Sequence, residues 1–128
     1  MTTFTFTIPA ITPSNNKLVK GRTHWSSYRR MKEDWFYLLK LGSQNLDIPA
    51  AADFEKRKVE VISYRLALLD QDNLAGGMKL LWDAMVDAGY LYDDGPSFLD
   101  APKPAQGVVH KRKDQRTEVR LTIFEEEP

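Results

Sequence analysis

Apolar and polar residues alternate at the start of the chain, where residues 4–8 read Phe-Thr-Phe-Thr-Ile. This period of two is typical of a half-buried strand. A longer strand is predicted over residues 56–69, which are rich in Val, Ile, Tyr and Leu. Because its last residues are apolar on both faces, we expect its C-terminal half to be central in a sheet. Residues 108–112 and 117–124 are predicted to pair as a hairpin across a polar turn.

Two further segments carry apolar residues three and four positions apart, which is the spacing of an amphipathic helix. The first helix is predicted to begin at Ser26 or Ser27, either of which can cap it, and to end at about Leu46. The second follows the long strand, with Asp72 or Asn73 as its predicted N-cap.

The predicted elements follow the order β-α-β-α-β-β, which indicates a small single domain of the α+β class. In this fold two helices would pack on one mixed sheet. Residues 9–16, rich in proline, serine and asparagine, are expected to form a loop. We expect the domain to span residues 1–124, followed by an acidic tail at residues 125–128.

The composition fits one globular domain, with 128 residues of which 42% are hydrophobic and 28% charged. No stretch reaches the ~18 consecutive apolar residues of a membrane helix, and the first residues lack the pattern of a signal peptide. The chain has no cysteine, which excludes disulfides and thiolate metal sites, and we expect a cytoplasmic protein. Basic and acidic residues each number 18, so the net charge is zero.

Two acidic groups flank the second predicted helix. Asp70, Asp72 and Asn73 precede it, and Asp93 and Asp94 follow it. The first two aspartates are two positions apart in extended chain, so their side chains share one face. Carboxylates gathered at one place are costly to desolvate, whereas oxygen ligands suit a hard cation such as Mg²⁺. We therefore predict a metal site that handles phosphate, to which one residue of the second group contributes.

A lysine lies inside the same predicted helix. Lys79 is within reach of a phosphate bound at the acidic corner, and Asp83 can hold its ammonium group in place. Each feature also has an ordinary structural explanation. Asp72 and Asn73 can cap a helix, residues 93–96 can form a plain turn, and the lysine and Asp83 can be a solvated surface pair. The functional interpretation depends on the combination, because both acidic groups flank one helix that also carries the lysine.

Two runs of residues resemble a known family. The longer run comprises Asp70-Gln71-Asp72-Asn73-Leu74, Lys79, Asp83-Ala84, Gly89 and Asp93-Asp94, and the shorter comprises Ile8-Pro9, Pro13-Ser14-Asn15-Asn16 and Gly21-Arg22-Thr23-His24. In this order they resemble the RusA family of Holliday junction resolvases, often encoded by a phage or prophage. The resemblance implies a RusA-like homodimer of α+β fold. Such a protein binds four-way DNA junctions and cuts two opposed strands with Mg²⁺, for which Mn²⁺ can substitute.

The resemblance also implies roles for single residues. Asp70, Asp72 and Asp94 would bind the metal, with Asp93 as a neighbour of lesser importance, and Lys79 would be the catalytic lysine. Contacts to DNA are expected from amide and basic side chains, namely Asn15, Asn16, Lys17, Lys20, Arg22, His24, Arg29, Arg30, Asn73, Lys111, Arg112 and Lys113.

The chain departs from the family's best-known member at two places. Residues 75–77 look like an insertion ahead of Lys79, and three residues rotate a helix by ~300°, which keeps the lysine on about the same face. Residues 67–69 stand where that member has a run of arginines. The expected function is a Mg²⁺-dependent, structure-selective DNA endonuclease that resolves Holliday junctions by paired symmetric nicks. The alternative is a catalytically degenerate relative that acts as a DNA-binding or structural protein.

Overall fold

The computed structural model describes the backbone of residues 1–22 and 25–124, and their side chains except those of residues 19–22, 25 and 26. Its elements, in chain order, are β1 (Thr2–Ile8), α1 (Asn15–Arg22), α2 (Trp25–Gly42), β2 (Arg57–Arg65), α3 (Gln71–Gly77), α4 (Lys79–Asp87), β3 (Leu99–Asp100), β4 (Ala105–Val108), the 3-10 helix η1 (Arg112–Asp114) and β5 (Arg116–Ile123). The predicted acidic tail lies outside the described residues.

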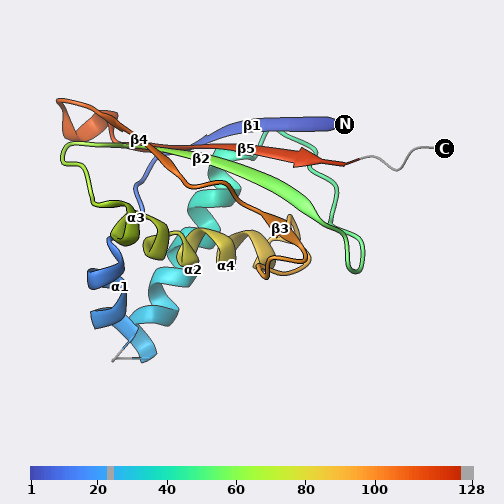
Figure 1. Cartoon of the computed structure of the whole chain (residues 1–128), viewed down its shortest axis with the longest axis horizontal. Coiled ribbons are helices and arrows are strands. Elements are labelled where there is room, and N and C mark those ends of the chain that lie inside the picture. Colours follow the sequence, from blue (N-terminus) through green and yellow to red (C-terminus); the bar gives the residue numbers. More distant parts are fainter. Residues whose placement is uncertain (23–24, 125–128) are drawn as a thin grey trace.

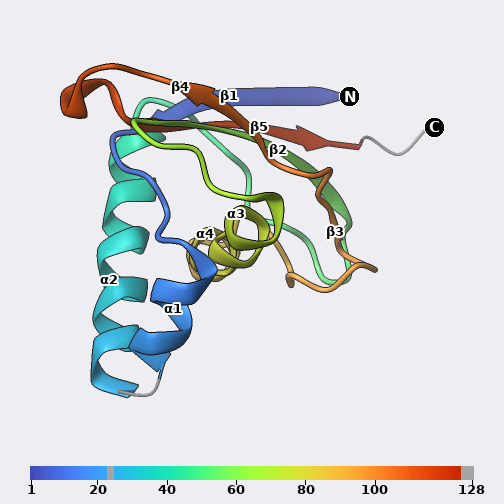
Figure 2. The same ribbon diagram turned by 60° about the vertical axis from the view of Figure 1, so that its left-hand side comes forward.

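The five strands form one mixed sheet in the order β1-β5-β2-β3, and β4 also pairs with β2. β5 runs antiparallel to both β1 and β2, whereas β3 and β4 run parallel to β2. β2 is therefore paired on both edges, which confirms its central position. Figures 1 and 2 show the helices together on one face of this sheet. The predicted class, a small α+β domain with a mixed sheet, is confirmed.

The core lies between the sheet and the helices. Alternate side chains of β1, β2 and β5 face it, because successive residues of a strand point to opposite faces. The buried residues of the sheet are Phe6, Ile8, Val59, Val61, Val119 and Leu121, and those of α2 and α4 include Trp35, Leu39, Leu81 and Met85. This packing holds α4 beneath the sheet. It thereby positions the residues at both ends of α4, where the candidate site lies.

The predicted hairpin at the end of the chain is wrong. β5 lies between β1 and β2, so both of its edges are already occupied. Residues 105–108 pair in parallel with β2 instead, and residues 112–114 form η1. A hairpin is the cheapest pairing for two strands close in sequence. Here β5 instead pairs along its length with β1 on one edge and β2 on the other.

The helices also differ from the prediction in number and in their caps. The segment after Asp70 forms two helices, α3 and α4, which meet at Met78. Asp70 itself is the N-cap of α3, in place of the predicted Asp72 or Asn73. An additional helix, α1, occupies part of the predicted loop and the basic stretch after it. The Ser14 hydroxyl begins α1 by accepting the Lys17 N–H at 3.2 Å.

β2 ends at Arg65, four residues before the predicted end of the strand. Leu66 and Leu68, taken as apolar strand positions, are 40% and 56% exposed. The backbone N–H of Leu66 donates to the side chain of Gln115, which ends the ladder. Among the described helices, none has the length and apolar character needed to cross a membrane.

Candidate functional site

Asp70 lies where the chain leaves the sheet and enters α3. Its Oδ1 accepts the backbone N–H of Asn73 at 2.9 Å, and its Oδ2 accepts the side-chain amide of Asn73 at 2.8 Å. The backbone hydrogen bond, followed by the side-chain one, lowers the pKa of the Asp70 carboxyl. This exposed carboxylate therefore stays negative at neutral pH, at the tip of a helix.

Neighbouring elements fix the position of Asp70 from two sides. Asn73 Oδ1 accepts the backbone N–H of Asn16, at 3.1 Å, and so joins α3 to α1. The residue before the aspartate, Leu69, is held by Gln106 of β4. The side chain of Gln106 accepts the Leu69 N–H at 2.9 Å and donates to the Leu69 carbonyl at 2.8 Å. The corner is therefore built by three segments that are remote in sequence.

Lys79 is the first residue of α4, and its ammonium group lies between two carboxylates. Its Nζ is 3.1 Å from Asp83 Oδ1, one turn along the helix, and 3.1 Å from Asp94 Oδ2, beyond the helix end. The other oxygen of Asp83 accepts the hydroxyl of Tyr28 from α2. The predicted pair of Lys79 with Asp83 is confirmed, and the structure also brings the lysine to one of the predicted metal ligands.

The charge state of Lys79 follows from these contacts. Partial burial on its own would lower the pKa of the lysine, but the hydrogen bonds with Asp94 and Asp83 outweigh it, so the pKa is raised. Lys79 is therefore cationic at neutral pH. It can neutralise negative charge on a phosphate, and it cannot serve as a proton acceptor. Because 46% of its side chain is exposed, solvent screens both ion pairs and they add little to stability.

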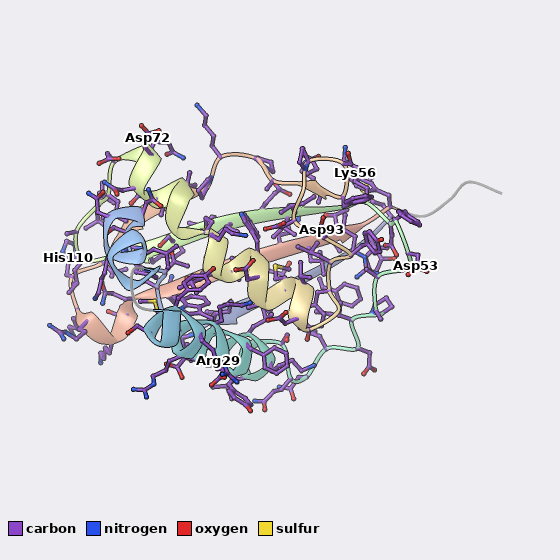
Figure 3. All side chains as sticks on the ribbon, turned by 90° about the horizontal axis from the view of Figure 1, so that it is seen from below. Arg29, Asp53, Lys56, Asp72, Asp93 and His110 are labelled. Atoms are coloured by element: carbon purple, nitrogen blue, oxygen red, sulfur yellow. The ribbon has the colours of Figure 1, made fainter. Side chains whose placement is uncertain are left out.

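The two acidic groups do not gather into one corner. Asp72 and Asp93 are exposed, and Figure 3 shows them at separate places on the molecule. Asp93 Oδ1 accepts the backbone N–H of Asp94 at 2.9 Å, as in an ordinary turn. Within residues 1–22 and 25–124, no three His, Asp or Glu side chains lie close enough to share a metal ion. The aspartates as arranged here therefore do not fit a metal centre.

The reason lies in the partners that the carboxylates already have. Asp70 is engaged by Asn73, and Asp94 is engaged by Lys79. A shared ion would require at least the lysine contact to open and the loop of residues 93–96 to approach α3.

Among the described side chains, the predicted basic DNA contacts lie on or beside η1, α1 and α2. Residues 111–113 are exposed at η1, on the loop between β4 and β5. Lys17 of α1 and Arg30 of α2 are also exposed, while Arg29 pairs with Glu33 at 3.3 Å. Three predicted contacts lie outside the described side chains, namely Lys20, Arg22 and His24.

Sequence reasoning missed the role of two glycines. A Cβ atom on Gly77 would lie 2.0 Å from the carbonyl oxygen of Pro13, and one on Gly76 would lie 2.5 Å from the side chain of Asn15. The supposed insertion is therefore the contact surface between α3 and the start of α1. Adjacent glycines in a helical segment are the signal that could have indicated it, because they weaken a helix unless a close approach requires them.

Comparison with known proteins adds no assignment. The chain matches no model of a known protein family, and a search of curated proteins found no significant match. The resemblance to RusA proteins therefore remains an expectation from the residues quoted in the sequence analysis.

Proposed function

We propose that the protein is a RusA-like, Mg²⁺-dependent endonuclease that acts as a homodimer on four-way DNA junctions. The observation that carries the proposal is the contact of Lys79 with Asp94, two residues of the quoted pattern that come from different segments. A cationic lysine held by carboxylates is the group expected beside a phosphate under attack. Mn²⁺ is expected to replace Mg²⁺.

The roles of the chain's own residues follow from their positions. Lys79 would stabilise the charge that develops on the phosphate oxygens, and preorganised charge is most effective in the transition state. Asp83, oriented by Tyr28, would hold the ammonium group when Asp94 is engaged elsewhere. Asp70, Asp72 and Asp94 are the oxygen ligands proposed for Mg²⁺. To bind one ion together they would need Asp94 to leave Lys79 and the loop of residues 93–96 to approach α3 when DNA is bound. Symmetric cutting of two strands requires two such sites, and a two-fold dimer provides them.

The second candidate is a catalytically degenerate relative that binds DNA or serves a structural role. One observation favours it: the described residues contain no ready-made group of three metal ligands. Exposed basic residues, such as Arg112 and Lys113 on η1, would be sufficient for binding the backbone of DNA.

The two candidates differ in one assay. A synthetic four-way junction and a linear duplex of the same sequence are incubated with the protein, with and without Mg²⁺, and both cleavage and band shift are recorded. Metal-dependent paired nicks confined to the junction support the endonuclease. Binding of the junction without cutting supports the degenerate relative, and cutting of flaps instead would change the substrate class.

A matched pair of lysine variants locates the site in the same assay. Lys79→Gln is expected to lower the cleavage rate by about 10²–10³-fold, because one preorganised charge is lost at the reacting phosphate. Lys103→Gln removes an equal charge from an exposed lysine elsewhere and should leave the rate unchanged. Equal rates for both variants would contradict the role of Lys79.

A further inference from the structure

Two arginines are buried on the helix-facing side of β2, and their surroundings differ. Arg57 is 1% exposed and Arg65 is 6% exposed. Arg57 has a carboxylate partner, Glu55, at 2.6 Å, and it also donates to two backbone carbonyls. Arg65 donates from Nη1 alone, to the carbonyl of Thr12 at 2.9 Å and to Ser63 Oγ at 3.3 Å. Among the described residues, no acidic side chain pairs with Arg65.

A buried guanidinium without a counter-ion is unfavourable, because its charge is removed from water and not compensated. Burial accordingly lowers the pKa of Arg65. Its Nε and Nη2 atoms have no hydrogen-bond partner within the described part of the chain, so donors remain for a ligand. The matched position of Arg57 shows how the same strand satisfies an arginine when a carboxylate is at hand.

Arg65 lines a cavity of about 490 Å³, formed by the segment before α1, one side of α2 and the end of β2. This volume is within the range of small-molecule sites. Leu69 and Leu80 also line it, and they directly adjoin Asp70 and Lys79 in sequence. The cavity is therefore next to the candidate active site, although it shares none of that site's charged residues.

The polar groups of this cavity are mostly hydrogen-bond donors. Thr12 is fully buried, and its hydroxyl has no partner among the described residues. The hydroxyl of Ser14 accepts the Lys17 N–H, so its own hydrogen remains to be donated. Lys17 adds an exposed ammonium group at the rim. Together with Arg65, these groups form a donor set that suits an oxyanion.

One acidic residue faces the same cavity. Asp34 of α2 is exposed and forms no ion pair with Arg65 or Lys17. It therefore stays hydrated at the rim and does not neutralise the arginine. Apolar side chains, including Met31, Trp35 and Leu38, supply the opposite wall. A ligand that combines an anionic group with an apolar ring system matches both parts of the lining.

We propose that this cavity binds the phosphate group of a nucleotide unit, with Arg65, Thr12, Ser14 and Lys17 donating to its oxygens. The unit can be a free mononucleotide or the phosphorylated end of a DNA strand, since both present the same chemistry. This inference stands independently of the endonuclease proposal, because binding here requires neither a metal nor cleavage.

The test is a titration of the whole protein with small probe molecules. Binding is measured by calorimetry and by the shift in Tm. The probes are inorganic phosphate, deoxyadenosine 5′-monophosphate and deoxyadenosine, at constant ionic strength. We expect saturable binding of phosphate, tighter binding of the monophosphate and none of the nucleoside. A short oligonucleotide with a 5′-phosphate is then compared with its 5′-hydroxyl form. Tighter binding of the phosphorylated oligonucleotide indicates a site for the strand end, and equal binding of the two forms indicates a site for the free nucleotide. Absence of saturable binding by both phosphate and the monophosphate would overturn the proposal.

Variants separate a ligand site from a structural arginine. Thr12→Val removes the unpaired hydroxyl, so it should leave the Tm of the free protein unchanged or raise it while weakening phosphate binding at least threefold. Asp34→Asn should strengthen binding, because it removes the repelling carboxylate. Arg65→Gln should abolish binding. If that variant fails to fold, Thr12→Val and Asp34→Asn still show whether phosphate binds in this cavity. Phosphate affinity that is the same in wild type, Thr12→Val and Asp34→Asn would show that the anion does not occupy this cavity.

Discussion

Lys79 Nζ and Asp94 Oδ2 are 3.1 Å apart, although fifteen positions separate the two residues in the chain. The contact exists because α4 packs beneath the sheet and the chain then returns toward the start of that helix. It joins the basic residue of the candidate site to one of its predicted metal ligands. It also takes up the carboxylate that a metal would need, so the proposed function requires this ion pair to be exchangeable.

Replacing Asp94 with Asn should lower the pKa of Lys79, because one of the two carboxylates that raise it is removed. We expect little change in stability, since an exposed ion pair contributes about 0–1 kcal/mol, and we expect cleavage to be lost. The pKa is measured by NMR titration of the lysine Cε and its protons. The matched variant Asp93→Asn keeps the oxygen that accepts the Asp94 N–H and removes a charge that has no part in the raised pKa of Lys79, so the lysine pKa should not move. Equal pKa changes in both variants would contradict the assigned geometry.

Asp70 combines a structural and a chemical role, and two substitutions separate them. Asp70→Asn keeps an oxygen that accepts the Asn73 N–H and so preserves the N-cap, whereas Asp70→Ala removes it. We expect Asp70→Ala to have the lower Tm, and both variants to lose cleavage because the charge is gone. Thermal unfolding measures the Tm of each variant, and the junction assay measures its cleavage. Full activity of the Asn variant would show that only the cap matters.

The glycine pair of α3 predicts a graded response to alanine. Gly77→Ala places a Cβ against the backbone oxygen of Pro13, which cannot move easily, and should destabilise the fold by about 1–3 kcal/mol. Gly76→Ala meets the side chain of Asn15, which can rotate away, so a smaller loss is expected. Urea unfolding of both variants measures the difference. The reverse order would mean that α3 does not pack on this segment.

Acid should weaken the fold in part through Glu55. Burial alone would raise the pKa of this carboxyl, but its hydrogen bonds with Arg57 and the N–H of Ala52 lower it overall. A lowered pKa in the folded state means that the stabilisation is complete above the unfolded value, about 4.3, and is lost as the pH falls through the folded value. Glu55→Gln should therefore flatten the stability profile below pH ~4. If Glu55→Gln leaves the dependence of stability on pH below ~4 unchanged, Glu55 does not contribute to acid unfolding.

Local pattern predicted much of the fold. The period of two at residues 4–8 and the apolar stripe of α2 each correspond to an observed element. In both elements the apolar residues repeat at the spacing of the face that is buried against the core. The partners of β5 could not be predicted in this way, since its pairing with β1 depends on residues more than one hundred positions away. The end of β2 was also missed. Leu66 and Leu68 are apolar but exposed, and composition does not distinguish a buried leucine from an exposed one.

The candidate site shows the same division. The pair of Lys79 with Asp83 follows from a spacing of four on a helix, and spacing alone predicts it. The contact of Tyr28 with Asp83 and that of Gln106 with Leu69 depend on tertiary packing, and no sequence signal indicated them. Convergence of the acidic groups was expected because both flank one helix. The break at Met78 and the hydrogen bonds of Asp70 instead place them in separate local structures.

The most direct test of the central claim uses a supercoiled plasmid that extrudes a cruciform, incubated with the protein and Mg²⁺. Two symmetric nicks across the junction yield linear plasmid, whereas one nick yields an open circle. We predict linear product with the wild-type protein, product that forms about 10²–10³-fold more slowly with Lys79→Gln, and none from a plasmid that lacks the cruciform. A plasmid that stays supercoiled while the protein demonstrably binds the cruciform would contradict the account.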